Sequence, residues 1–351
     1  MFSKRNNTKG QVGIALHDGG VTIGQCTWKN GEYANPRVLR IDKNPRDLTA
    51  DCWRNILTQS SNMGSDCVLS LPPSIAYHQV LRLPNMLPSE LKEAAAWEMV
   101  DRLGVERSSL QLDAIPIGDG GDVLAVAIDQ NTLAGLLEPL YSAGFCPTAI
   151  EPHCISVART LSMLHRRQSD STNVRAVFDF GMHDSAFMVI AGDALVFYKQ
   201  LKHSGTSLIE SISSQTNVTT AQAESMLENL KSDTKDKEIS KAVRDATRAT
   251  HEAIATDAMK CIRHYGVTNR GPVSAQLVVS GSSGWNPFLA QALDAVCSQN
   301  IVKVGDVRHI QALPESVTLA NGWHVALGAS LTGLSSQRQR RGSDLITKEA
   351  A

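Results

Sequence analysis

The two halves of this chain repeat one order of predicted elements, and this duplication limits the fold more than any other feature. In the first half the strand-like runs cover 11–17, 21–28, 36–41 and, after a helix at 47–59, residues 67–72. In the second half they cover 176–181, 185–190, 195–201 and, beyond several helices, 275–280. Each half therefore begins as an antiparallel meander and returns to its sheet after helical sequence. We expect an α/β fold of two similar domains with a ligand-binding cleft between them.

The composition restricts the classes of function. The chain has 351 residues, and its 42% hydrophobic and 20% charged residues are typical of a soluble globular protein. A formal net charge of −1 gives no support for binding nucleic acid or an anionic membrane surface. The seven cysteines form no CxxC pair, which argues against a zinc site or a disulfide framework and favours a reducing compartment. No run approaches the roughly 20 apolar residues of a membrane span, so we expect a cytoplasmic protein with no direct span.

Changes in sequence character predict the domain organisation. The linker at 168–173 is polar, and the segment that follows residue 73 alternates strand and helix patterns of its own. Ser89 is the predicted N-cap of a helix that ends near Leu103, and Thr219 and Gln222 have the spacing of a capping box. We predict a first domain (10–73 and 152–170), an inserted subdomain (74–151), a second domain (174–335) with a helical subdomain (225–271), and a disordered tail (336–351).

Three glycine-containing turns, at 13–20, 179–185 and 280–288, are the candidates for a ligand site. Small residues let the backbone approach a ligand, and tight turns present N–H groups that bind phosphate. Asp179 is an acid inside an apolar strand, a position from which a carboxylate holds Mg²⁺ directly or through water. One such turn is more often a plain hairpin, whereas three in this order indicate a phosphate site. The predicted nucleotide-binding residues are Gly19, Gly20, Asp179, Gly181, Ser185, Ser280, Gly281 and Ser282, with Asp179 also the predicted metal ligand.

The order of phosphate turn, inserted subdomain, DxG turn and SG-rich turn resembles the actin-like superfamily. Within it, the stretch 71–99, with its leucine–proline and its Ala96-Trp97-Glu98 run, is similar to the signature of the PilM family of type IV pilus assembly proteins, relatives of FtsA. The resemblance covers roughly residues 10–335. It implies an actin-like (duplicated ribonuclease H-like) two-domain ATPase fold with an FtsA-type inserted subdomain, and ATP with Mg²⁺ as ligands.

The first turn departs from the family pattern. Ala15 stands at the position of the family's acid, His17 at a glycine, and Thr22 at a lysine. One carboxylate on the metal side and one phosphate-binding cation are therefore missing, and Asp18 adds a negative charge beside the phosphates. Because phosphoryl transfer depends on these charges, the sequence predicts a degenerate nucleotide site with little or no hydrolysis. Glu151 stands where relatives orient the attacking water; the alternative, which we favour, is that it stabilises a helix N-terminus without catalysis.

The resemblance also implies a partner. PilM proteins grip the short cytoplasmic N-terminal peptide of a PilN-type bitopic inner-membrane protein, and we expect a groove for it between the inserted subdomain and the first domain. Its candidate lining residues are Val80, Leu81, Leu83 and Trp97. Trp97 is either an anchor for the partner or a cover for the subdomain's own sheet. Such a partner would bring the protein to the inner membrane as a peripheral component; self-association is a further expectation.

Three other functions remain as alternatives. The first is an active actin-superfamily ATPase or a small-molecule kinase, which Ala15 disfavours. A membrane-tethered polymer of the FtsA kind would need an amphipathic C-terminal helix, which the charged, non-periodic tail does not supply. The cytoplasmic part of a type II secretion protein would be followed by a transmembrane segment, which this sequence does not contain.

Overall fold

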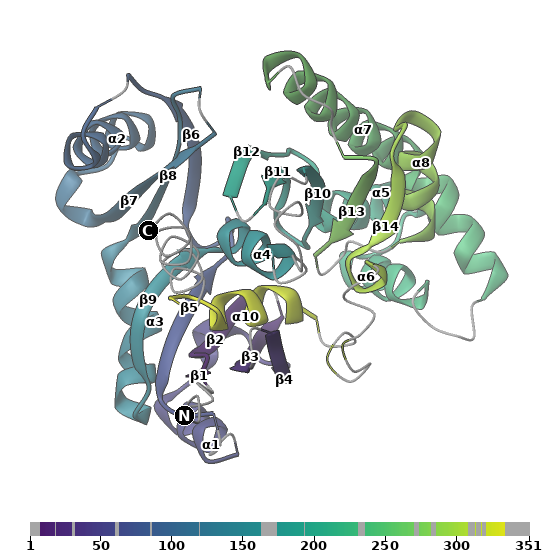
Figure 1. The fold of residues 1–351 in the computed structure, drawn as a ribbon. Coiled ribbons are helices and arrows are strands. Elements are labelled where there is room, and N and C mark those ends of the chain that lie inside the picture. Colours follow the sequence, from purple (N-terminus) through teal and green to yellow (C-terminus); the bar gives the residue numbers. More distant parts are fainter. Residues whose placement is uncertain are drawn as a thin grey trace, which may run out of the picture.

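The computed structural model describes residues 8–17, 19–29, 32–59, 63–84, 86–118, 120–162, 174–192, 194–230, 236–269, 274–281, 286–307, 313, 317 and 321–333. Two of its sheets share one topology, three antiparallel strands followed by two parallel ones (Figure 1). The first has the order β4-β3-β2-β5-β9, with β1 also paired to β3; the second has the order β12-β11-β10-β13-β14. This repetition confirms the predicted duplication.

The strands of these two sheets begin and end close to the predicted runs. Those of the first sheet are β1 (Thr8–Lys9), β2 (Val12–His17), β3 (Gly20–Lys29), β4 (Glu32–Ile41), β5 (Asp66–Leu71) and β9 (Cys146–Pro152). Those of the second are β10 (Val174–Phe180), β11 (Ser185–Ala191), β12 (Ala194–Gln200), β13 (Gln276–Ser280) and β14 (Asn300–Lys303). The strands β2, β11 and β13 are buried along nearly their whole length, as expected for central strands covered on both faces.

Helices cover both sheets. On the first lobe α1 (Ala50–Gln59) and α3 (Gln130–Ala143) share a core with β2, β3 and β5, in which the rings of Trp53 and Phe145 meet edge to face. On the second lobe α5 (Gly205–Thr216), α6 (Thr220–Asn229), α7 (Lys237–Asn269) and α8 (Pro287–Val296) pack around one apolar core. The polar helix α7 therefore buries one full face, although its sequence suggested a solvent-exposed element. Short 3-10 helices η1 (Pro45–Asp47), η2 (Arg107–Ser109) and η4 (Val304–Asp306) complete the connections.

Two helices connect the lobes. α4 (His153–Ser162) and α10 (Trp323–Ser330) pack on each other, and both belong to a core that contains residues of both sheets. After β14 the chain thus returns to the first sheet, where α10 lies against β2 and β3 (Figure 1). The contact is so close that a Cβ atom on Gly13 would lie 1.9 Å from the Ala326 carbonyl oxygen. Only glycine fits there, and α10 fixes the rear wall of the space between the lobes.

A third sheet forms the inserted subdomain. It has the order β6-β8-β7, formed by β6 (Tyr77–Arg82), β7 (Leu110–Ile117) and β8 (Asp122–Asp129), and it is covered by α2 (Pro88–Leu103). The sequence analysis did not predict β7. It also placed the end of the subdomain at residue 151, whereas α3 packs in the core of the first lobe and β9 pairs with β5. The separate sheet therefore spans 77–129. No helix among the described residues has the length and apolar content needed to cross a membrane.

Candidate functional site

The predicted phosphate-binding turns meet at one small cavity between the two lobes. Strands β2 and β10 carry His17 and Asp179 to its walls, and the chain before α10 closes it. The described residues that line it are His17, Pro72, His153, Asp179, Gly181, Asp184, Gly281, Asn321, Gly322, His324 and Val325. The sequence prediction that the three turns converge is therefore supported by the geometry. Ala15 is fully buried in the core that joins the lobes, two residues from the cavity wall.

Side chains fill the space beside the first turn. The His17 imidazole, where the resemblance implied a glycine, has its Nε2 3.0 Å from the Thr22 hydroxyl. That hydroxyl donates to the backbone carbonyl of Asn321. His17 also contacts the backbone of the chain before α10, since a Cβ on Gly322 would lie 3.2 Å from its ring. Thr22, at the position of the family's lysine, is thus occupied by protein groups and carries no charge.

Asp179 lies in the wall of the cavity, as predicted, but its side chain is held by neighbouring protein groups. Its Oδ1 accepts a hydrogen bond from the Ser280 hydroxyl at 2.7 Å, and the His324 Nε2 lies 4.0 Å away. The side chain of Asp179 is 16% exposed. Burial lowers the pKa of His324, and the neighbouring carboxylate opposes that effect. Asp179 is therefore held by a serine and faces a buried imidazole.

The other predicted nucleotide ligands lie nearby, but several are already engaged. The Ser185 hydroxyl donates to the His203 carbonyl, and the Gly181 N–H donates to the Asp184 carbonyl at 2.8 Å. Gly281 has a φ of +95°, and a Cβ there would lie 2.4 Å from the Phe180 carbonyl oxygen, so the close approach of β10 requires glycine. Gly19 (φ +104°) and Gly20 form the β2–β3 turn outside the cavity lining. Ser282 and Asp18 lie outside the described residues.

The cavity does not fit the ligand that the fold suggests. Its volume is about 40 Å³, whereas small-molecule sites have roughly 300–1,000 Å³. The phosphate-binding lysine is replaced by Thr22, and Asp184 adds a carboxylate whose Oδ2 accepts from the Ser74 N–H at 3.0 Å. No group of three or more histidine, cysteine or acidic side chains among the described residues is arranged to hold a metal ion. A cavity of this size does not accommodate a nucleoside triphosphate.

Buried histidines are the signal that the sequence analysis undervalued. Burial lowers the pKa of His153 to about 3, with smaller contributions from His78, His17 and His324, and lowers that of His17 to about 4. Within the described part of the chain, His153 Nε2 and both ring nitrogens of His324 have no hydrogen-bond partner. These uncharged imidazoles replace the cations that a phosphate site requires.

Glu151, the predicted water-orienting acid, makes four hydrogen bonds away from this cavity. Its carboxylate accepts from the Arg159 guanidinium at 2.6 and 2.9 Å, from the Ser156 hydroxyl at 2.6 Å and from the Thr332 hydroxyl at 3.2 Å. It lines a different hollow, described next, and not the cavity that contains Asp179. Its catalytic role remains a prediction.

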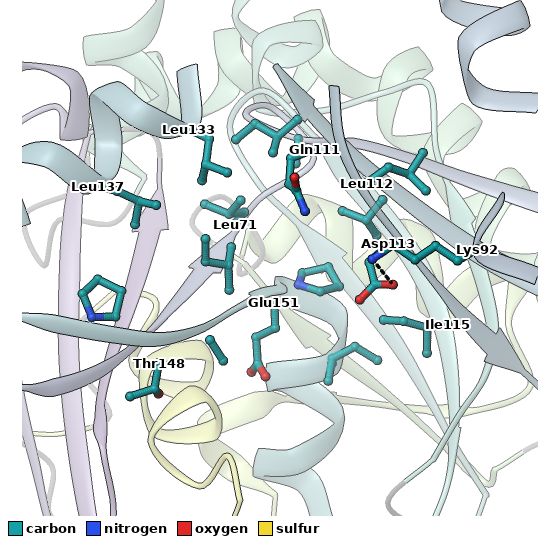
Figure 2. A pocket seen from close by; sticks show the side chains of 18 of the residues that line it. Leu71, Lys92, Gln111, Leu112, Asp113, Ile115, Leu133, Leu137, Thr148 and Glu151 are labelled. Atoms are coloured by element: carbon teal, nitrogen blue, oxygen red, sulfur yellow. Dashed lines mark ion pairs between the residues drawn. The ribbon is translucent and has the colours of Figure 1, made fainter. Parts of the chain in front are cut away.

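A groove of about 460 Å³ runs between the inserted subdomain and the first lobe, and Figure 2 shows its walls. Leu133 and Leu137 of α3 line one side, and Leu112 and Ile115 of β7 line the opposite side. The remaining apolar lining residues include Leu71, Ala76, Val126, Ile128, Tyr141, Ile150 and Ile155. The polar groups are the ion pair between Lys92 and Asp113 (3.5 Å), the Gln111 amide, the Thr148 hydroxyl and Glu151. Such a lining suits a ligand with mostly apolar side chains.

Strand edges border this groove on both sides. β9 is the outermost strand of the first sheet in its described order, and β7 is the outermost strand of the inserted sheet. An outermost strand presents backbone N–H and C=O groups to whatever lies beside it. Prolines limit this at Pro116, Pro147 and Pro152. Thr148–Glu151 of β9 contains no proline, and its backbone groups that do not pair with β5 face outward.

The four predicted groove residues lie elsewhere in the inserted subdomain. Leu81 is buried in its core and Leu83 packs against that core. Val80 faces a different pocket, beside β12. Trp97, 69% exposed, lies on the outer face of α2. None of the four lines the groove; they were chosen from a signature stretch, and the strand β7 that forms the wall was not predicted.

No protein-family model matches the sequence, and no curated protein matches it. Among solved structures, the chain is similar to one titled "PilM-PilN type IV pilus biogenesis complex", with a TM-score of 0.69 and 18% identity over 92% of this chain and 98% of that one. It is also similar to the ethanolamine utilization protein EutJ from Carboxydothermus hydrogenoformans, with a TM-score of 0.50 and 12% identity over 92% and 89% of the two chains. This chain has the actin-like ATPase fold. At these identities the likeness establishes the fold and no activity.

Proposed function

We propose that this protein is an actin-like scaffold of a type IV pilus or pseudopilus assembly machine. In this proposal it binds the cytoplasmic N-terminal peptide of a PilN-type bitopic inner-membrane protein, and the peptide lies in the groove between β7 and β9. The observation that carries the proposal is the groove itself, because it combines apolar walls with two open strand edges. The structural likeness to a PilM–PilN complex supports the choice of partner.

The chemistry of the groove defines the peptide it accepts. Extended peptides gain affinity from main-chain hydrogen bonds to a strand edge and specificity from pockets for alternate side chains. The run Thr148–Glu151 offers such an edge, and Leu133, Leu137 and Ile115 offer apolar contacts. The Lys92–Asp113 pair at the β7 side supplies partners for a polar group of the peptide. We therefore expect an extended segment with alternating apolar residues.

The nucleotide site supports a scaffold more than an enzyme. A cavity of about 40 Å³, a threonine in place of the lysine, and uncharged histidines leave no arrangement that stabilises a transferring phosphoryl group. The position of Asp179 is compatible with the alternatives of an ATPase or a small-molecule kinase, but the small cavity and the uncharged Thr22 disfavour both. In this proposal the protein is cytoplasmic and reaches the inner membrane only through its partner.

The test uses a PilN-type bitopic protein from the same organism. Its cytoplasmic N-terminal peptide, synthesised with a fluorophore, is titrated with the full-length protein, and binding is followed by fluorescence anisotropy. Ile150→Lys places a charge at the β9 edge and is expected to weaken binding at least about tenfold. Val296→Lys is the matched control, because Val296 on α8 is 41% exposed and Ile150 is 39% exposed. Equal affinity of the two variants for the peptide would contradict the proposal.

A further inference from the structure

A second pocket lies on the other side of the inserted sheet, against the second lobe. Its volume is about 790 Å³, which is within the range of small-molecule sites. β6 supplies His78, Gln79 and Val80, β12 supplies residues 197–200, and α7 supplies Lys260, Cys261 and His264. Neither the nucleotide cavity nor the peptide groove shares a lining residue with this pocket. It is therefore a separate candidate site.

Positive charge dominates the walls of this pocket. Lys199, Lys202 and Lys260 line it, against the single lining carboxylate of Asp122. Lys260 also pairs with Asp257 at 3.0 Å on the exposed face of α7, while Lys199 and Lys202 form no ion pair among the described residues. Burial raises the pKa of the Cys261 thiol to about 11, and Lys199 and Lys260 oppose that rise. The ammonium groups of Lys199 and Lys260 therefore both lie near the Cys261 thiol.

A buried histidine adds a hydrogen-bonding group. His78 is 7% exposed and its Nδ1 lies 3.2 Å from the Tyr198 hydroxyl, whereas its Nε2 has no partner among the described residues. Either atom can be the donor in this pair, depending on the tautomer of the ring. Nε2 is a buried polar atom of this wall whose hydrogen bond is unmade, which is costly.

Aromatic rings form part of the same wall. The centroids of Phe197 and His264 are 6.0 Å apart with the planes tilted by 51°. His264 is exposed and Phe197 is half-buried, so both rings retain surface toward the pocket. Flat heterocycles stack on such rings whatever the arrangement of their hydrogen-bond donors and acceptors.

We propose that this pocket binds a nucleoside phosphate, with its phosphates between Lys199, Lys202 and Lys260 and its base against Phe197 and His264. Lysine acts as a point charge for phosphate, and three lysines offset much of the negative charge of a di- or triphosphate. The ligand needs no metal ion here, because the cations are provided by the protein. This site is independent of the proposed peptide groove and of the cavity that contains Asp179.

The experiment is isothermal titration calorimetry of the full chain with ATP and, separately, with tripolyphosphate, both in EDTA. ATP is expected to bind one to one and several-fold more tightly than tripolyphosphate, because only ATP contacts the rings. Lys199→Glu and Lys260→Glu are each expected to weaken both ligands at least about tenfold, because each reverses a charge at the phosphates. His264→Ala is expected to weaken ATP and to leave tripolyphosphate unchanged.

Two controls locate the binding. Lys241→Glu reverses an exposed charge on the same helix, nineteen residues and about 28 Å from Lys260, and is expected to leave affinity unchanged. Asp179→Ala changes the cavity between the lobes and not this pocket, so it is also expected to leave the affinity for ATP unchanged. No binding of ATP, or equal affinity for ATP and tripolyphosphate, would overturn the proposal. So would loss of binding in Asp179→Ala, or an equal loss in Lys241→Glu and Lys260→Glu.

Discussion

Glu151 and Arg159 form a two-pronged ion pair in which each carboxylate oxygen accepts from one guanidinium nitrogen, at 2.6 and 2.9 Å. The side chains are only 10% and 14% exposed, so this is a buried pair. Arg159 also donates to the Gly328 carbonyl at 2.9 Å, and Glu151 accepts from Thr332 at 3.2 Å. The pair therefore joins β9, α4 and α10, the elements that connect the peptide groove to the rest of the first lobe.

Removing one partner of this pair should cost stability. Glu151→Ala leaves a buried guanidinium without its carboxylate, and we expect a loss of about 3–5 kcal/mol in the free energy of unfolding, measured by urea denaturation. Glu98→Ala is the matched control, since Glu98 pairs with Arg102 at 3.6 Å on an exposed face of α2 and should cost below about 1 kcal/mol. Equal losses in the two variants would show that the pair has no structural role.

The nucleotide cavity should be inert. We expect phosphate release from ATP at the background rate in the wild-type protein and in Asp179→Ala, because the site lacks the lysine and is filled by His17. His17→Gly restores the small residue of the family pattern, yet should produce no turnover while Ala15 and Thr22 remain. Turnover above background that Asp179→Ala abolishes would support the enzyme alternative.

Acid should destabilise the fold through its buried histidines. Burial lowers the pKa of His153 to about 3 and those of His17, His78 and His251 to about 4, below the value near 6.5 of an unfolded chain. Between the folded and unfolded pKa values, the unfolded chain binds more protons than the folded chain. The contribution of these histidines to the free energy of unfolding is therefore fully present above pH 6.5 and is lost as the pH falls toward 4. Each histidine contributes a slope of up to about 1.4 kcal/mol per pH unit. The free energy of unfolding of His153→Asn, measured across this range, should show a slope smaller by that amount; an unchanged slope would contradict the assignment.

Two exposed aromatic residues should separate the two candidate partner surfaces. Tyr141, 57% exposed, lines the groove, and Trp97, 69% exposed, lies on the outer face of α2. Tyr141→Ser is expected to weaken binding of the partner peptide several-fold, as loss of an interface aromatic does, and Trp97→Ser to leave it unchanged. Anisotropy titration measures the affinity of both variants for the peptide. Weaker binding by Trp97→Ser with unchanged binding by Tyr141→Ser would place the partner on α2.

Local signals in the sequence predicted the elements well. The capping box of Thr219 and Gln222 is present at the start of α6, and the runs at 11–17, 21–28 and 185–190 are strands. Ser89 is not the N-cap of α2, which begins at Pro88 with Leu87 as its cap. Proline at the first helical position is favoured because its missing N–H is not needed there. The duplicated α/β organisation followed from the order of these local elements, and the actin-like fold was implied by the resemblance to that superfamily.

Long-range pairing could not be predicted in the same way. β7 contains Asp113 and Pro116, which interrupt a strand pattern, and only its place at a sheet edge makes the proline tolerable. β9 pairs with β5, about eighty residues earlier, and no periodicity identifies a partner so distant in the chain. The small volume of the nucleotide cavity depends on Asn321 and His324 meeting His17, some three hundred residues away. These relationships arise from tertiary packing alone.

The central claim is that the partner's cytoplasmic peptide lies between β7 and β9, and amide hydrogen exchange of the full chain with and without that peptide tests it directly. The account predicts slower exchange in segments 110–117 and 146–152, because backbone groups at open strand edges become hydrogen-bonded. It predicts unchanged exchange in α2. Protection of α2 with no change in β7 and β9 would contradict the account.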